Sequence, residues 1–104
     1  MGFRLQLKIE LIEEYVEHHK AVWPEMLAEL QRAGWNNYSL FLDRTDGVLF
    51  GYFETPDLSS AKQQMALTEV NARWQEMMSP YFIELDGLRP DEGFKQLEEI
   101  FHLP

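Results

Sequence analysis

The chain has 104 residues and a formal net charge of −9, because 18 Asp or Glu outnumber nine Lys or Arg, and it contains no cysteine. Without cysteine it can form no disulfide framework, thiolate zinc site or cysteine nucleophile, and the acidic excess opposes binding to the phosphate backbone of nucleic acids. The length and the 45% of hydrophobic residues predict one domain over residues 1–104, with a packed core and with a small molecule or another protein as partner.

Residues 3–9 alternate apolar and polar side chains, which predicts a strand with one buried face. This start lacks the apolar core of a signal peptide, and no part of the chain approaches the ~20 apolar residues of a membrane span. We therefore expect a cytoplasmic protein that does not bind membranes. Residues 11–33 follow a helical period, and Pro24 predicts a kink or short break because it removes a backbone donor. Gly34 is suited to end this helical region.

The middle of the chain predicts a hairpin and a second helical region. Residues 37–43 and 48–54 are strand-like and are joined by an Asp-Gly turn at Gly47. Residues 56–78 are helical, and Thr68 is placed to interrupt and re-cap the helix. The remaining elements are a fourth strand, a loop and a short terminal strand or tail, at residues 81–85, 87–93 and 97–103.

This order of elements, βαββαβ followed by a C-terminal strand or tail, predicts an α+β two-layer sandwich of the ferredoxin-like kind. Helices in such a fold cover one face of the sheet and leave the other bare. We expect Leu49, Phe53 and Phe82 to lie on the bare face. Pairing two bare faces in a homodimer, a dimeric α/β barrel in which the terminal tail crosses over, would bury them.

Tyr15, His19 and Trp23 recur at every fourth position and so line up along one side of the first helix. At 100° per residue His19 lies near the middle of the apolar stripe, and His18 lies towards its edge. A buried imidazole needs a hydrogen-bond partner or a cavity, so His19 is either a bonded core histidine or a group that exchanges protons near neutral pH. No metal site is expected, because adjacent His18 and His19 diverge on a helix and His102 is isolated.

Three further side chains have both a structural and a functional interpretation. Glu25 either stabilises the positive N-terminal end of a helix or is a proton-transfer partner of His19. Tyr38 and Trp74 are either core aromatics or platforms for a ligand. In a ferredoxin-like sandwich both helices face the same sheet, so these aromatics and the first helix can converge on one pocket. Aromatic faces with a few hydroxyl and imidazole groups suit a neutral amphipathic ligand such as a sugar.

Several blocks of the sequence, with their spacing, are shared with one family. They are Glu14-Tyr15, His19, Trp23-Pro24-Glu25, Gly34, Asn37-Tyr38, Leu42-Asp43, Leu49-Phe50, Arg73-Trp74 and residues 97–104. In these blocks the chain resembles the L-rhamnose mutarotases nearly from end to end. The resemblance implies a dimeric ferredoxin-like isomerase that interconverts the α and β anomers of L-rhamnose, or of a related 6-deoxy or L-hexose sugar, and that needs no cofactor.

The resemblance also implies a role for each matching residue. His19 matches the family's proton donor, and Tyr15 and Tyr38 match tyrosines that bind the sugar. Trp74 matches the first member of an aromatic pair, of which the second member here is Gln75 rather than tryptophan. We expect both residues to contact the sugar, with one stacking surface lost and one amide gained.

Mutarotation opens and recloses a hemiacetal, which needs a positioned acid and base but no covalent intermediate. Glu25, Asp43 or a water molecule is the expected partner of His19 in this exchange. Two other functions use the same fold or the same pocket. One is that of a ferredoxin-like monooxygenase or haem-handling protein, and the other is that of a sugar-binding module without catalytic activity.

Overall fold

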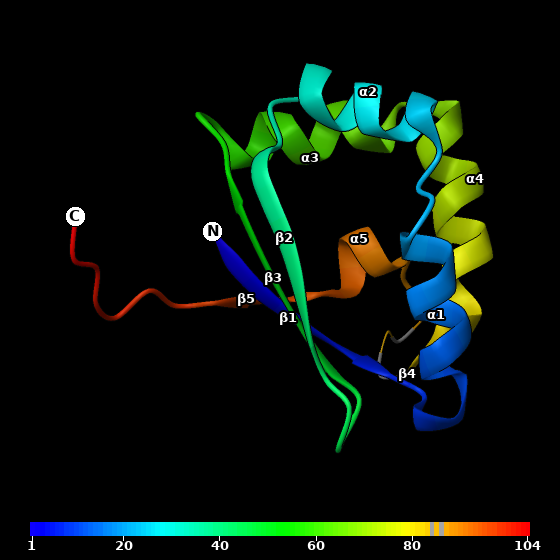
Figure 1. The fold of residues 1–104 in the computed structure, drawn as a ribbon. Helices are drawn as coiled ribbons and strands as arrows, with labels where there is room; N and C mark the ends of the chain where they lie inside the picture. Colours follow the sequence, from blue (N-terminus) through cyan, green and yellow to red (C-terminus); the bar gives the residue numbers. More distant parts are fainter. Residues whose placement is uncertain (84, 86) are drawn as a thin grey trace.

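The sheet is built around the first strand, whose alternating apolar residues place one face against the helices. The computed structural model describes residues 1–83, 85 and 87–104. All strand pairs are antiparallel, in the order β2-β3-β1-β4, and β5 pairs with the same edge of β1 as β4 (Figure 1). This is the order of a ferredoxin-like sandwich, so the predicted fold class is confirmed. The strands are β1 (Gly2–Leu7), β2 (Asn36–Asp43), β3 (Val48–Glu54), β4 (Phe82–Ile83) and β5 (Lys95–Leu97).

The helical layer follows the predicted breaks. Pro24 is the first residue of α2, so the first helical region is divided, and Gly34 ends α2 with φ +90°. Thr68 re-caps the second region, because its hydroxyl accepts a hydrogen bond from the backbone N–H of Asn71 at 3.3 Å. The helices are α1 (Ile12–His19), α2 (Pro24–Arg32), α3 (Leu58–Ala66), α4 (Glu69–Met78) and α5 (Pro90–Gly93), with 3₁₀ turns η1 (Ile9–Leu11) and η2 (Ser79–Tyr81).

The element ends differ from the prediction at three places. The first strand stops at Leu7, and Ile9 is 58% exposed in the turn that follows. The predicted fourth strand contains only β4, and its Glu84 lies outside the described residues. The predicted loop at 87–93 contains the short helix α5, and the terminal strand is β5 rather than residues 97–103. These are short elements, which packing decides more than local pattern does.

The expected position of Leu49, Phe53 and Phe82 on the bare face is wrong. They are 2%, 0% and 6% exposed and belong to the core between the sheet and the helices. The alternation of a strand separates its two faces but does not say which face the helices cover.

The bare face of the sheet carries a different apolar set. Phe41 is 61% exposed, and Phe50, Tyr52 and Ile83 are each a little over 40% exposed. Beyond β5 the chain runs away from the body of the molecule, and its Ile100, Phe101 and Leu103 are exposed (Figure 1). Among the described residues no helix has the length and apolar character that crossing a membrane requires.

Candidate functional site

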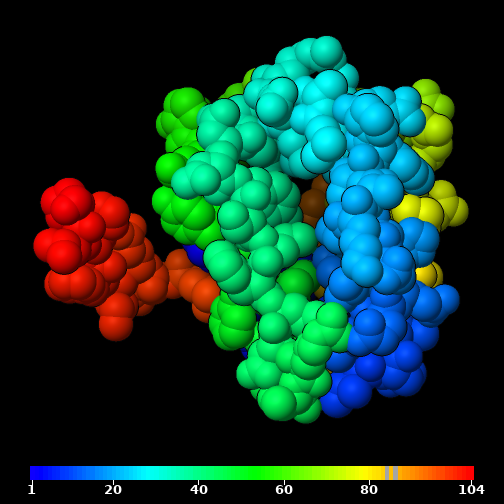
Figure 2. Space-filling view, viewed as in Figure 1, coloured from blue at the N-terminus to red at the C-terminus, as the bar shows by residue number. Residues whose placement is uncertain are grey.

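The sheet and the helical layer enclose a cavity of about 400 Å³, a size typical of small-molecule sites. Figure 2 shows a hollow between β2 and α1 with atoms of α5 at its base. Most of the wall is aliphatic or aromatic. The side chains with polar atoms that line it are Tyr15, His19, Trp35, Tyr38, Asn71, Trp74, Gln75 and Asp91.

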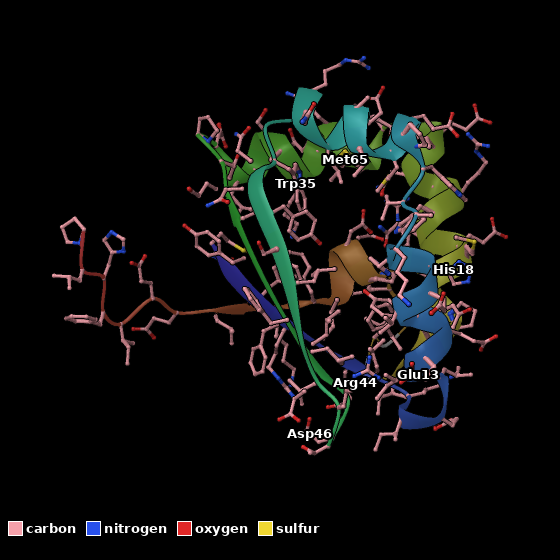
Figure 3. The ribbon with its side chains drawn as sticks, viewed as in Figure 1. Glu13, His18, Trp35, Arg44, Asp46 and Met65 are labelled. Atoms are coloured by element: carbon pink, nitrogen blue, oxygen red, sulfur yellow. The ribbon has the colours of Figure 1, made fainter. Side chains whose placement is uncertain are left out.

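A bulge in β2 shapes one wall of the cavity. The pairing with β3 shifts between Asn36 and Ser39, and Asn37 has φ 47°. As a result Trp35 and Tyr38 both lie on the helix side of the sheet. The Trp35 ring stacks on Phe53 at 4.0 Å between centroids, and the Tyr38 ring lies 5.3 Å from Trp35. Figure 3 shows Trp35, just before β2, and Met65, on α3, beside this space.

His19 lies at the end of α1 with its imidazole in the cavity wall. Its Nδ1 is 2.9 Å from the carbonyl oxygen of Tyr15, and because a carbonyl only accepts, Nδ1–H is the donor. The neutral ring therefore has its lone pair on Nε2. Burial lowers the pKa of His19, against the opposing effect of the bond to the Tyr15 carbonyl, and nearby His18 lowers it further. The Trp74 ring meets the imidazole edge-on at 5.4 Å.

The two tyrosines supply neutral hydroxyl groups to the cavity. Burial raises the pKa of Tyr15, and the proximity of Tyr38 raises it further. Burial also raises the pKa of Tyr38, to which the charge of Asp91 adds. Tyr38 is 38% exposed as a residue of an edge strand, but its ring packs against Trp35 and Phe53. Both hydroxyls thus keep their protons at neutral pH and can donate them in hydrogen bonds.

Trp74 and Gln75 are buried on the inner side of α4, at 6% and 8% exposure. Gln75 Nε2 donates to Asn71 Oδ1 at 3.1 Å, and Gln75 Oε1 accepts from the backbone N–H of Asp91 at 3.2 Å. The amide that takes the place of a second tryptophan therefore joins α4 to α5 as well as lining the cavity.

Sequence reasoning did not find Asn71 and Asp91. Asn71 precedes Trp74 and Gln75 by three and four positions, which places it on the same helix face and was the available signal. Asp91 lies in a segment expected to be a loop, and only the packing of α5 against α4 brings its carboxylate to the cavity.

All five predicted site residues, namely Tyr15, His19, Tyr38, Trp74 and Gln75, line the cavity. Two of the expected proton-transfer partners of His19, the carboxylates of Glu25 and Asp43, do not line it. Glu25 is exposed and lies 3.8 Å from Arg73, and Asp43 accepts hydrogen bonds from Thr45 in the turn after β2. Asp91 is the carboxylate found among the described lining residues.

His18 has a different environment from His19, as its place at the edge of the stripe predicts. Its Nε2 is 3.1 Å from the hydroxyl of Tyr81, outside the cavity lining. No group of three or more His, Asp or Glu in the described part of the chain is arranged to hold a metal ion.

The fold and the site together define a ferredoxin-like protein that has a cavity of small-molecule size, with aromatic side chains and one imidazole in its wall. The chain belongs to the L-rhamnose mutarotase family, whose model matches residues 1–103. The L-rhamnose mutarotase of Oceanobacillus iheyensis is 36% identical over 98% of this chain and 95% of its own length. That of Bacillus subtilis is 38% identical over 88% and 85%. The crystal structure of L-rhamnose mutarotase from Formosa agariphila superposes with a TM-score of 0.79, at 25% identity, over 99% of this chain and 96% of that one.

Proposed function

We propose that the cavity is the active site in which this isomerase, an L-rhamnose mutarotase, interconverts the α and β anomers of its sugar. The observation that carries the proposal is the imidazole of His19 in the wall of a cavity of about 400 Å³, with the lone pair of the neutral ring on Nε2. The family membership supplies the substrate, and the cavity has a suitable size and an aromatic lining for a neutral pyranose.

In the proposed reaction one imidazole moves the proton in both directions. Neutral His19 takes the proton of the anomeric hydroxyl at Nε2 and delivers it to the ring oxygen while the bond between that oxygen and C1 breaks. The two oxygens are bonded to the same carbon, so a single nitrogen can serve both. The open-chain aldehyde turns about its C1–C2 bond, and the reverse transfer closes the ring on the other face. In ring opening and in ring closure alike, His19 first accepts a proton from one oxygen and then donates it to the other.

The remaining predicted site residues would bind the sugar. The hydroxyls of Tyr15 and Tyr38 donate hydrogen bonds to sugar oxygens, and Trp74 offers an aromatic surface to the apolar face of the ring. Gln75 uses one N–H and one lone pair in its bonds to Asn71 and Asp91. The described residues leave one N–H and one lone pair of this amide for a sugar hydroxyl.

Exchange NMR on equilibrated L-rhamnose tests the proposal by measuring magnetisation transfer between the anomeric protons. The wild type should accelerate transfer, and His19→Ala should lose about 10²- to 10⁴-fold of that acceleration. His18→Ala is the matched control and should retain it, because His18 bonds to Tyr81 outside the cavity. Equal acceleration by both variants would remove His19 from its role. Sugar binding by the wild type without acceleration would make the protein a binding module.

The proposal includes a homodimer formed through the bare sheet face, with the C-terminal tail of each copy crossing to the other. The exposed Phe41, Phe50 and Tyr52 and the apolar tail residues support this, because a second copy would cover them. Light scattering should give a mass about twice the 12.3 kDa of the chain. Phe50→Glu should reduce the mass, whereas Leu67→Glu, at an equally apolar position 87% exposed at the end of α3, should not. A monomeric wild type would contradict the proposal.

The single domain of residues 1–104 and the cytoplasmic location remain predictions. One cooperative unfolding transition is expected for the first, and cell fractionation tests the second.

A further inference from the structure

The wall of the cavity at α5 holds the carboxylate of Asp91, which two side chains, Arg89 and Asn71, fix directly and a third, Gln75, supports. Arg89 Nε donates to Asp91 Oδ1 at 3.1 Å and Arg89 Nη2 to Oδ2 at 2.7 Å, which is the two-point pairing that a guanidinium favours. Asn71 Nδ2 donates to the same Oδ2 at 2.9 Å. Gln75 then bonds both to Asn71 and to the backbone N–H of Asp91. The orientation of this carboxylate is therefore set from α4 and from Arg89, the residue that precedes α5.

The described residues do not exhaust the hydrogen-bond capacity of the carboxylate. Oδ2 accepts two hydrogen bonds, from Arg89 and Asn71, whereas Oδ1 accepts one. A carboxylate oxygen has two lone pairs, so Oδ1 can accept one more donor. The Asp91 side chain is only 15% exposed and it lines the cavity. A hydroxyl group of a molecule in the cavity is a suitable donor.

A position on the protein surface would serve a purely structural ion pair between Arg89 and Asp91 equally well. Placing the carboxylate in a largely apolar wall instead has an energetic cost, which its three donors offset. The charge also acts across the cavity, since Asp91 contributes to the raised pKa of Tyr38. The cavity is thus lined by a hydrogen-bond donor, the hydroxyl of Tyr38, and by a hydrogen-bond acceptor, the carboxylate of Asp91.

We infer that Asp91 is a sugar-binding residue that determines specificity, whose Oδ1 accepts a hydrogen bond from one ring hydroxyl of the substrate. Arg89, Asn71 and Gln75 are its positioning residues. The inference rests on the proposed function and deepens it. In this role Asp91 favours neutral sugars that carry a hydroxyl at the contacted carbon. It disfavours sugar acids, because its fixed negative charge repels their carboxylate.

The test measures kcat and KM of mutarotation for the wild type, Asp91→Asn and Glu92→Gln. Loss of a hydrogen bond to a charged acceptor should raise the KM of Asp91→Asn by about ten- to hundredfold, with kcat within about threefold. Glu92→Gln is the matched control, because Glu92 is exposed and lies 3.6 Å from the same arginine without lining the cavity. It should keep the wild-type KM. An unchanged KM in a folded Asp91→Asn protein would overturn the inference.

The 2-, 3- and 4-deoxy derivatives of L-rhamnose separate a sugar contact from a structural role. With the wild type, one of them should show a KM raised about ten- to hundredfold, and for that sugar Asp91→Asn should add no further loss. Equal ratios of variant to wild-type KM for all sugars would assign Asp91 a structural role only. If Asp91→Asn does not fold, the wild-type series alone decides, because three unchanged KM values exclude the contact. A wild type without mutarotase activity refutes the proposed function itself, whereas an active wild type with an unaffected Asp91→Asn refutes only this inference.

Discussion

Gly51→Ala is a sharp test of how the sheet supports the cavity. Gly51 pairs with Phe3 across β1 and β3, and the ring of Phe3 lies directly over it. A Cβ at position 51 would lie 2.1 Å from the Cζ atom of Phe3 and 2.4 and 2.6 Å from its two Cε atoms. Ordinary carbon contacts are ~3.5–4.0 Å, so the ring would have to withdraw by more than ~1 Å. Phe3 is 3% exposed and meets Phe94 edge-on at 4.6 Å, so it has little space in which to move.

Overpacking of this kind costs about 1–3 kcal/mol, less a few tenths gained by replacing glycine in a strand. For a chain of this size the loss corresponds to a fall in Tm of about 4–20 °C. Because Phe3 also lines the cavity, the displaced ring should raise KM for the sugar. Urea unfolding and mutarotase kinetics measure both effects.

The double variant Phe3→Leu, Gly51→Ala provides the control. Phe3→Leu alone should cost about 1 kcal/mol, and in its presence the alanine should cost much less than in the wild type, because the clashing ring is gone. A Gly51→Ala protein as stable as the wild type would refute the argument, as would additive costs in the double variant.

Three further outcomes are expected. The base in the proposed reaction is neutral His19, and burial lowers its pKa. The value of kcat/KM should therefore be constant at neutral pH and fall as the pH drops through a midpoint below 6.5. A midpoint above 6.5 would contradict the assignment of His19 as the base. Gln75→Leu should lower the free energy of unfolding in urea by about 2–4 kcal/mol, because it leaves Asn71 Oδ1 and the backbone N–H of Asp91 without partners, and an unchanged value would show that these bonds contribute nothing. Trp74→Phe should raise the KM for L-rhamnose about two- to tenfold, because the stacking surface is smaller. A KM equal to that of the wild type in mutarotase kinetics would show that the sugar does not stack on Trp74.

The features that the sequence predicted correctly are those set by neighbours in the chain. The helical period turns His19 inward, Pro24 divides the first helical region because it lacks a backbone N–H, and Thr68 re-caps the second. The order of strands and helices then restricts the chain to very few two-layer arrangements, of which the ferredoxin-like one is observed.

The sequence order and the family resemblance predicted that Tyr15, His19, Tyr38, Trp74 and Gln75 meet in one pocket, and they do. Other contacts across the fold were decided by the tertiary structure alone. Strand alternation could not assign Leu49, Phe53 and Phe82 to the covered face, since both faces of this sheet carry large apolar residues. Asp91 lies 20 positions beyond Asn71, and the two meet only because α5 packs against α4. A local sequence pattern reflects the stability of one helix or strand at a time. The position of the Asp91 carboxylate depends instead on contacts between two elements, so the pattern of neither one predicts it.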